Sequence, residues 1–132
     1  MNFFNSRLLA VACASLAGIQ PVFAHHSFSN FDMSKMETVS GTVRALEWTN
    51  PHVWLWIDVP DGKGGVIPYG LEGAATGEMA RQGWSRTKVT KGEKITAEMH
   101  PLRSGQHGGS LGKTTFADGS SLGSTLVLKK GP

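Results

Sequence analysis

Histidine is the residue type in this sequence that points most directly to chemistry. The chain has five histidines, and His25 and His26 directly follow a stretch with the features of a secretory signal. If that stretch is removed after Ala24, the mature chain begins with a histidine whose α-amine and imidazole can together chelate one metal ion. A third nitrogen would complete a site that suits Cu(II), because imidazole ligands and tetragonal geometry favour that ion. Cleavage one residue earlier would place His26 third, another arrangement that chelates Cu(II) or Ni(II).

The other three histidines are the candidate partners of this terminus. His52 follows an Asn-Pro turn, and His100 ends a predicted strand. His107 lies in a glycine-rich stretch and is the weakest candidate. For each of them alone, a surface or hydrogen-bonded structural role is the plainer interpretation. The leading hypothesis is a copper-type site, and its predicted ligands are His25, His26, His52 and His100.

Methionine sulfur is a second type of metal ligand in this chain. Met33, Met36 and Met99 could bind Cu(I), because thioethers are soft ligands that select this ion. Met99 alternates with polar residues along a predicted strand, so it is more simply a core residue.

A row of aromatic residues gives an alternative that needs no metal. Trp54 and Trp56 share one side of a predicted strand, with Trp48 just before it. As a functional feature, the row is a binding face for a small ligand or a partner protein, since OB barrels hold ligands on this strand. As a structural feature, the two indoles are covered by the N-terminal segment through Phe28 and Phe31. The two interpretations are compatible, because a terminus that packs there would bring its histidines towards His52.

Motifs of enzymes are missing from the sequence. It contains no nucleophile elbow, phosphate loop, haem-attachment motif or His-Glu-x-x-His zinc motif. No spacing marks any two carboxylates as an acid–base pair; the residues considered are Glu47, Asp58, Glu72 and Glu98. A copper oxidase or oxygenase built on the N-terminal histidine is the least favoured hypothesis, because nothing else prepares a substrate surface. We therefore expect a binding protein rather than an enzyme.

The first 24 residues predict export. Arg7 precedes an apolar run over residues 8–19, and small residues stand at the −3 and −1 positions of a cleavage after Ala24, as in a secretory signal peptide. The run is shorter than the roughly 20 apolar residues that cross a bilayer. We therefore expect a periplasmic or secreted protein with no membrane span in its mature chain of 108 residues.

The mature chain has a nearly balanced charge. Removal of the signal lowers the net charge from +3 to +2, which is too small to indicate a nucleic-acid partner. The single cysteine, Cys13, lies in the signal, so no disulfide is expected. The length suits one core and one domain, and we expect a monomer.

Alternating patterns predict a mainly β domain over residues 37–132, preceded by an N-terminal segment over residues 25–36. Val53, Leu55, Ile57 and Val59 fall on one face of the sharpest pattern, and polar or aromatic residues fall on the other. A short helix with Gly83 as its stop follows the third strand. Residues 104–113 are predicted to be a mobile loop, and Asp118-Gly119 predicts a hairpin. The expected strands are 37–47, 52–59, 66–72, 93–100, 114–117 and 121–128, and the expected helix is 75–82.

This order of elements is typical of an OB-like barrel with five or six strands and one short helix after strand three. A plain β-sandwich is the alternative.

Several segments resemble a bacterial family of small exported proteins of unknown function. The Trp-x-Asn-Pro-His block at 48–52 is the most specific part, and the His-His-Ser start is the next. The resemblance implies a small, β-rich periplasmic domain and implies no activity. It covers essentially all of the mature chain, and the segments that carry it are Ala24-His25-His26-Ser27, Phe31-Asp32, Gly41-Thr42-Val43, Glu47-Trp48-Thr49-Asn50-Pro51-His52, Glu72, Gly83-Trp84 and Asp118-Gly119.

Overall fold

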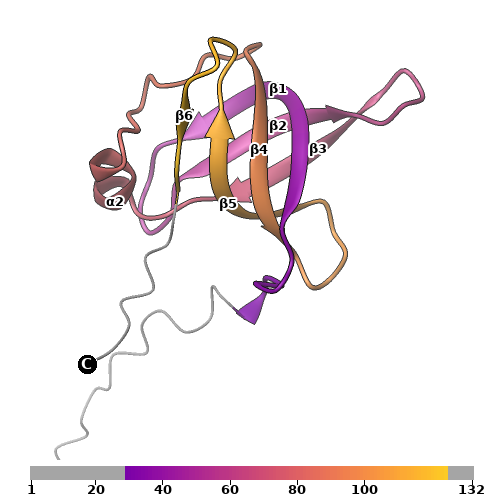
Figure 1. Ribbon diagram of the computed structural model, residues 1–132, viewed down its shortest axis with the longest axis horizontal. Coiled ribbons are helices and arrows are strands. Elements are labelled where there is room, and N and C mark those ends of the chain that lie inside the picture. The colour runs from indigo at the N-terminus through magenta and orange to yellow at the C-terminus, as the bar shows by residue number, and fades with distance from the viewer. Residues whose placement is uncertain (1–28, 125–132) are drawn as a thin grey trace, which may run out of the picture.

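The computed structural model describes residues 29–124 (Figure 1). The predicted signal peptide, His25, His26 and Phe28 lie outside these residues, as does the end of the last predicted strand. The elements, in chain order, are β1 (Glu37–Glu47), β2 (Trp54–Pro60), β3 (Val66–Glu72), α2 (Thr76–Arg81), β4 (Lys94–Pro101), β5 (Gly108–Thr115) and β6 (Ser121–Leu122).

The strands form a closed barrel with one additional strand. Their order is β3-β2-β1-β4-β5-β6, and all of these neighbours are antiparallel. A parallel pairing of β3 with β5, at Gly70–Gly108 to Glu72–Ser110, closes the first five strands on themselves. The prediction of an OB-like barrel with one short helix after strand three is confirmed, and the sandwich alternative is not the fold that forms.

Alternation along β2 produces the core as expected. Val53, Leu55 and Ile57 are each 0% exposed, whereas the intervening residues are half-buried on the outside of the barrel. Burial of each such side chain stabilises the fold by about 1.5–3 kcal/mol. Leu71 from β3 and Met99 from β4 join the same cluster, so the core assignment of Met99 is correct.

The predicted loop over residues 104–113 is wrong in its second half. Gly108 and Gly109 begin strand β5 and are buried. A Cβ atom on Gly108 would lie 2.5 Å from the Gly70 carbonyl oxygen, and one on Gly109 would lie 2.2 Å from that of His100. The glycines therefore allow β5 to approach β3 and β4 closely enough to close the barrel, which is a packing role rather than a source of flexibility.

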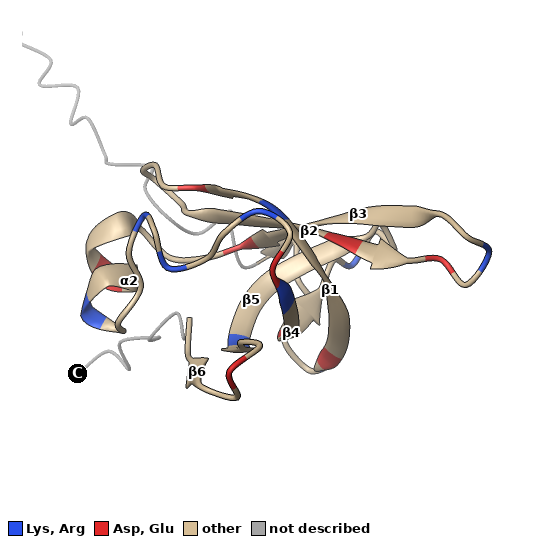
Figure 2. Ribbon diagram, turned by 90° about the horizontal axis from the view of Figure 1, so that it is seen from above, with Lys and Arg blue, Asp and Glu red and all other residues tan. Residues whose placement is uncertain are grey.

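The helix α2 covers one side of the barrel. Met79, its buried residue, is 0% exposed, and the Ser124 hydroxyl contacts its sulfur at 3.2 Å. Gly83 ends the helix region with φ of 95°, as the sequence predicts. Figure 2 shows basic and acidic residues interspersed over the strands and turns, in agreement with the small net charge.

Candidate functional site

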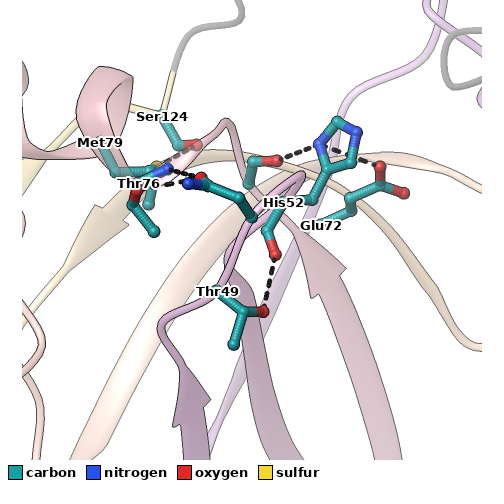
Figure 3. Close-up of polar contacts among 8 residues, drawn as sticks. Thr49, His52, Glu72, Thr76, Met79 and Ser124 are labelled. Carbon is teal, nitrogen blue, oxygen red and sulfur yellow. Dashed lines mark hydrogen bonds and ion pairs between the residues drawn. The ribbon is translucent and has the colours of Figure 1, made fainter. Parts of the chain in front are cut away.

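The turn before β2 connects His52 to the helix. Asn50 accepts hydrogen bonds through Oδ1 from the Thr76 backbone N–H (3.0 Å) and hydroxyl (2.9 Å). The residue before the helix, Ala75, has no side-chain capping bond, so Asn50 supplies the acceptor from 26 residues away. The Asn50–Pro51 peptide is cis, and Thr49 donates to the His52 carbonyl at 3.4 Å. These contacts fix the backbone that carries the His52 ring (Figure 3).

Nδ1 of the His52 ring lies near two acceptor groups. Its Nδ1 lies 3.0 Å from the Gly73 carbonyl oxygen and 3.3 Å from Glu72 Oε1. A carbonyl oxygen can only accept, so Nδ1 carries the proton and Nε2 of the neutral ring carries the lone pair. Metal-ligating histidines typically donate their other N–H to a carbonyl or carboxylate in this way. The contacts of Nδ1 (Figure 3) therefore favour a tautomer in which Nε2 can bind a metal.

His100 is held in the same manner by a different part of the chain. Its Nδ1 lies 2.6 Å from the Lys35 carbonyl oxygen, which again places the lone pair on Nε2. His107 differs, because its Nδ1 contacts the Tyr69 hydroxyl at 3.2 Å, and a hydroxyl can donate or accept. The His107 tautomer is therefore not fixed by this contact, and its side chain is exposed.

The two fixed histidines have separate partners. Ser110 of β5 aligns with Glu72 on β3 and with His100 on β4, so one strand lies between the His52–Glu72 pair and His100. Among residues 29–124, no three His, Cys, Asp or Glu residues could together hold a metal ion. The other two predicted ligands, His25 and His26, lie outside the described residues.

The aromatic row is a stacked pair on the outer face of β2. The rings of Trp54 and Trp56 are 5.7 Å apart and nearly parallel, at 17°. Trp56 lies over Gly70, where an added Cβ would come within 2.7 Å of its ring. Both indoles remain half-buried, and Trp56 Nε1 has no hydrogen-bond partner among the described residues. Trp48 is not part of this stacked pair, because it packs against the core.

The described position of Phe31 does not test the prediction that the N-terminal segment covers Trp54 and Trp56. It is buried, at 3% exposure, and bridges Leu102 just beyond β4. Since Phe28 lies outside the described residues, the prediction that the N-terminal segment covers Trp54 and Trp56 stays a prediction.

Three of the four carboxylates considered as acid–base candidates contact basic side chains. Asp58 pairs with Arg44 at 2.6 Å, and Glu98 pairs with Lys113 at 3.3 Å. Glu72 contacts His52, and Glu47 is exposed at the end of β1. These contacts compensate charge and give no pair of carboxylates with opposite protonation needs.

Two contacts of these histidine sites were not predicted from the sequence. Asn50 was interpreted only as a turn residue, and Lys35 was not considered because its carbonyl, not its side chain, makes the contact. A helix start with a weak local cap at Ala75 was the available signal for the first. No sequence signal indicates the second, since backbone carbonyls are common to all residues.

One comparison with known proteins gives a family. A family model described as "Family of unknown function (DUF6152)" matches residues 10–112. The chain belongs to this family. The DUF6152 match extends from before the predicted cleavage point into β5 and so includes His52 and His100. The expected membership in a family of unknown function is confirmed, whereas the two motifs and the export of its members stay predictions.

Searches of curated proteins and of solved structures found no match. Within residues 29–124, no helix has the length and apolar character needed to cross a membrane.

Proposed function

We propose that this DUF6152 protein binds copper in the periplasm through a histidine terminus created by removal of residues 1–24. The α-amine and imidazole of His25 chelate Cu(II), the neighbouring His26 contributes, and His52 supplies a further nitrogen. Delivery, storage or sensing of the metal would follow. The observation that carries the proposal is the His52 ring, whose Nδ1 is held by the Gly73 carbonyl and by Glu72.

His52, Glu72 and the Gly73 carbonyl together are called the His52 corner, and its expected chemistry follows from their contacts. Histidine binds metal as the neutral ring, so affinity should fall as pH drops through the range in which imidazole protonates. The Glu72 carboxylate beside Nδ1 makes the ring a stronger donor and places a negative charge near the cation. The half-buried position of both side chains, 26% and 13% exposed, limits competition from water.

Three variants test the role of the His52 corner. His52→Ala, which removes the ligand itself, should weaken Cu(II) binding by about 100-fold or more. Glu72→Gln should weaken it by about tenfold, the lower end of the range of about 10–100-fold for loss of a ligand's outer partner. His107→Ala is the matched control, since its ring is exposed and contacts only Tyr69 among the described residues. The measurement is a Cu(II) titration against a weak competing chelator. Equal affinities for His52→Ala and His107→Ala would refute the proposed role of His52.

A metal-free binding module is the second candidate, and the stacked pair Trp54–Trp56 favours it. The partly exposed, stacked rings form an apolar surface, which is a typical anchor for a small ligand. Trp54→Ala should then abolish the rise in Tm that a ligand-containing periplasmic extract produces, in apo protein and with chelator present. A rise of equal size in Trp54→Ala would eliminate this candidate.

A further inference from the structure

The segment before β1 is a turn that is fixed at both ends. The Asp32 backbone N–H donates to the Pro101 carbonyl at 2.8 Å, and Lys35 N–H donates to the Asp32 carbonyl at 3.1 Å. Asp32 Oδ1 accepts from the Ser34 hydroxyl at 2.6 Å and from its N–H at 3.2 Å. The Lys35 carbonyl in turn holds the His100 ring. The turn is therefore docked on the end of β4.

Two methionines of this turn are exposed. Met33 is 38% exposed and Met36 is 54% exposed, and Val66 is the one other large hydrophobic residue that is exposed in the part of the chain described. Single exposed apolar residues are ordinary. Here, however, Met33, Met36 and His100 all line one cavity of about 220 Å³. Exposure of two flexible apolar side chains around one cavity calls for an explanation beyond packing.

The cavity has the ligand chemistry of a soft metal ion. The Lys35 carbonyl fixes the His100 proton on Nδ1, so Nε2 carries the lone pair. Glu98 also lines the cavity, but its carboxylate is paired with Lys113 at 3.3 Å. Besides the serines Ser110 and Ser124, the remaining side chains with donor atoms are two thioethers and one imidazole, a set that favours monovalent copper over harder divalent ions.

We propose that the sulfur atoms of Met33 and Met36 and Nε2 of His100 form a Cu(I) site. The proposal assigns His100, which was predicted from the sequence to join the N-terminal ligands, to a separate site. The Cu(I) site therefore shares no ligand with the Cu(II) site proposed for His25, His26 and His52. Met33 and Met36 stand three residues apart in the sequence, on a segment that the His100 ring contacts through the Lys35 carbonyl. The ligands therefore come from two segments that the docked turn already brings together.

Methyl resonances of the methionines give a direct test. Ag(I), a redox-inert substitute for Cu(I), is added to mature protein with ¹³C-labelled methionine methyl groups. The methyl signals of Met33 and Met36 should shift and saturate at one equivalent, whereas those of the buried Met79 and Met99, 0% and 1% exposed, should not. Shifts spread over all four, or none at Met33 and Met36, would overturn the proposal.

Competition for Cu(I) with bicinchoninate under anaerobic conditions tests the ligands. The double variant Met33→Leu/Met36→Leu keeps apolar volume and removes both sulfurs, and it should weaken Cu(I) binding by more than about tenfold, as should His100→Ala. Val66→Ala is the control, and His25→Ala should leave Cu(I) binding unchanged even if it abolishes Cu(II) binding. Cu(I) affinity that is lost in His25→Ala and retained in the double Leu variant would assign Cu(I) to the terminus and refute this site.

Discussion

The corner around His52 and the turn around His100 use the same device in different surroundings. In both, a backbone carbonyl holds Nδ1 of the imidazole, from Gly73 in one case and from Lys35 in the other. His52 has a carboxylate beside it, whereas His100 shares a cavity with two thioethers. In the two proposed sites, the neighbours of each histidine would therefore favour different oxidation states of copper.

The two regions also differ in what supports them. The His52 corner is tied to α2 through Asn50 and to the chain after β3 through Gly73. The His100 turn is tied to the end of β4 and depends on the close approach of β5 at Gly109. Substitutions in these supports should therefore separate the two regions, and substitutions in the shared core should not.

The largest effect is expected from Leu55→Ala. Leu55 is 0% exposed inside the barrel that supports both regions, so its truncation should lower the free energy of unfolding by about 2–5 kcal/mol. Chemical denaturation measures this change, and binding of Cu(II) and Cu(I) should weaken together as the fold loosens. Val66→Ala, at a position 53% exposed, should change stability by no more than about 0.5 kcal/mol. Equal effects of the two substitutions would contradict the assigned core.

Gly109→Ala should impair the turn around His100 more than the corner around His52, and it should cost less stability than Leu55→Ala. The new methyl group would stand 2.2 Å from the His100 carbonyl oxygen and 3.1 Å from the Met99 sulfur, and such overpacking costs about 1–3 kcal/mol. Thermal unfolding measures the cost, and Ag(I) shifts of the turn methionines should weaken while Cu(II) binding persists. Gly77→Ala is the control, because its Cβ would meet only the end of Arg81 at 3.8 Å. Selective loss of Cu(II) binding in Gly109→Ala would reverse the comparison.

Asn50→Ala should affect the corner around His52 rather than the turn around His100. It removes the acceptor of two hydrogen bonds from Thr76, and loss of a capping side chain costs about 0.5–2 kcal/mol. Cu(II) binding should weaken and Cu(I) binding should not. Asn50→Asp keeps an oxygen acceptor and should retain most of the stability. If Asn50→Asp and Asn50→Ala are equally destabilised, the capping role is wrong.

The smallest effect concerns acid pH and involves neither histidine. The Ser120 hydroxyl and backbone N–H hold the pKa of Asp118 below its ordinary value of 3.8. A carboxyl with a lowered folded-state pKa stabilises the fold above its unfolded pKa, and this contribution is lost as pH falls through the folded pKa. Asp118→Asn should therefore flatten the decline of stability below pH 4 and leave copper binding between pH 5 and 7 unchanged, as Tm and copper titrations across pH would show. A change in copper binding there would show that the β5–β6 hairpin is coupled to a site.

Local pattern was enough to predict the barrel. The alternation of Val53, Leu55 and Ile57 identified an inner face, and the turns and the Gly83 stop placed the helix after the third strand. The glycine-rich start of β5 was misread because glycine signals both flexible loops and close backbone contact, and only the neighbouring strands decide between them.

The candidate sites depend on contacts that local pattern does not encode. Asn50 reaches Thr76 across 26 residues, and His100 reaches Lys35 across 65. His52 and His100 were selected as ligands by residue type alone, and their fixed tautomers became visible only with the fold. Met33 and Met36 were noted as soft ligands, but nothing in their spacing connected them with His100.

We propose that the new N-terminus binds copper. The most direct test of this proposal is a Cu(II) titration of mature protein purified from the periplasm, with the terminus at His25 established by mass spectrometry, beside the same protein with one extra residue before His25. We expect one-to-one binding that survives a weak competing chelator and is lost in the extended form, because the α-amine is no longer part of the histidine chelate. Binding of equal strength in the two forms, or a mature chain that does not begin within one residue of His25, would contradict the account.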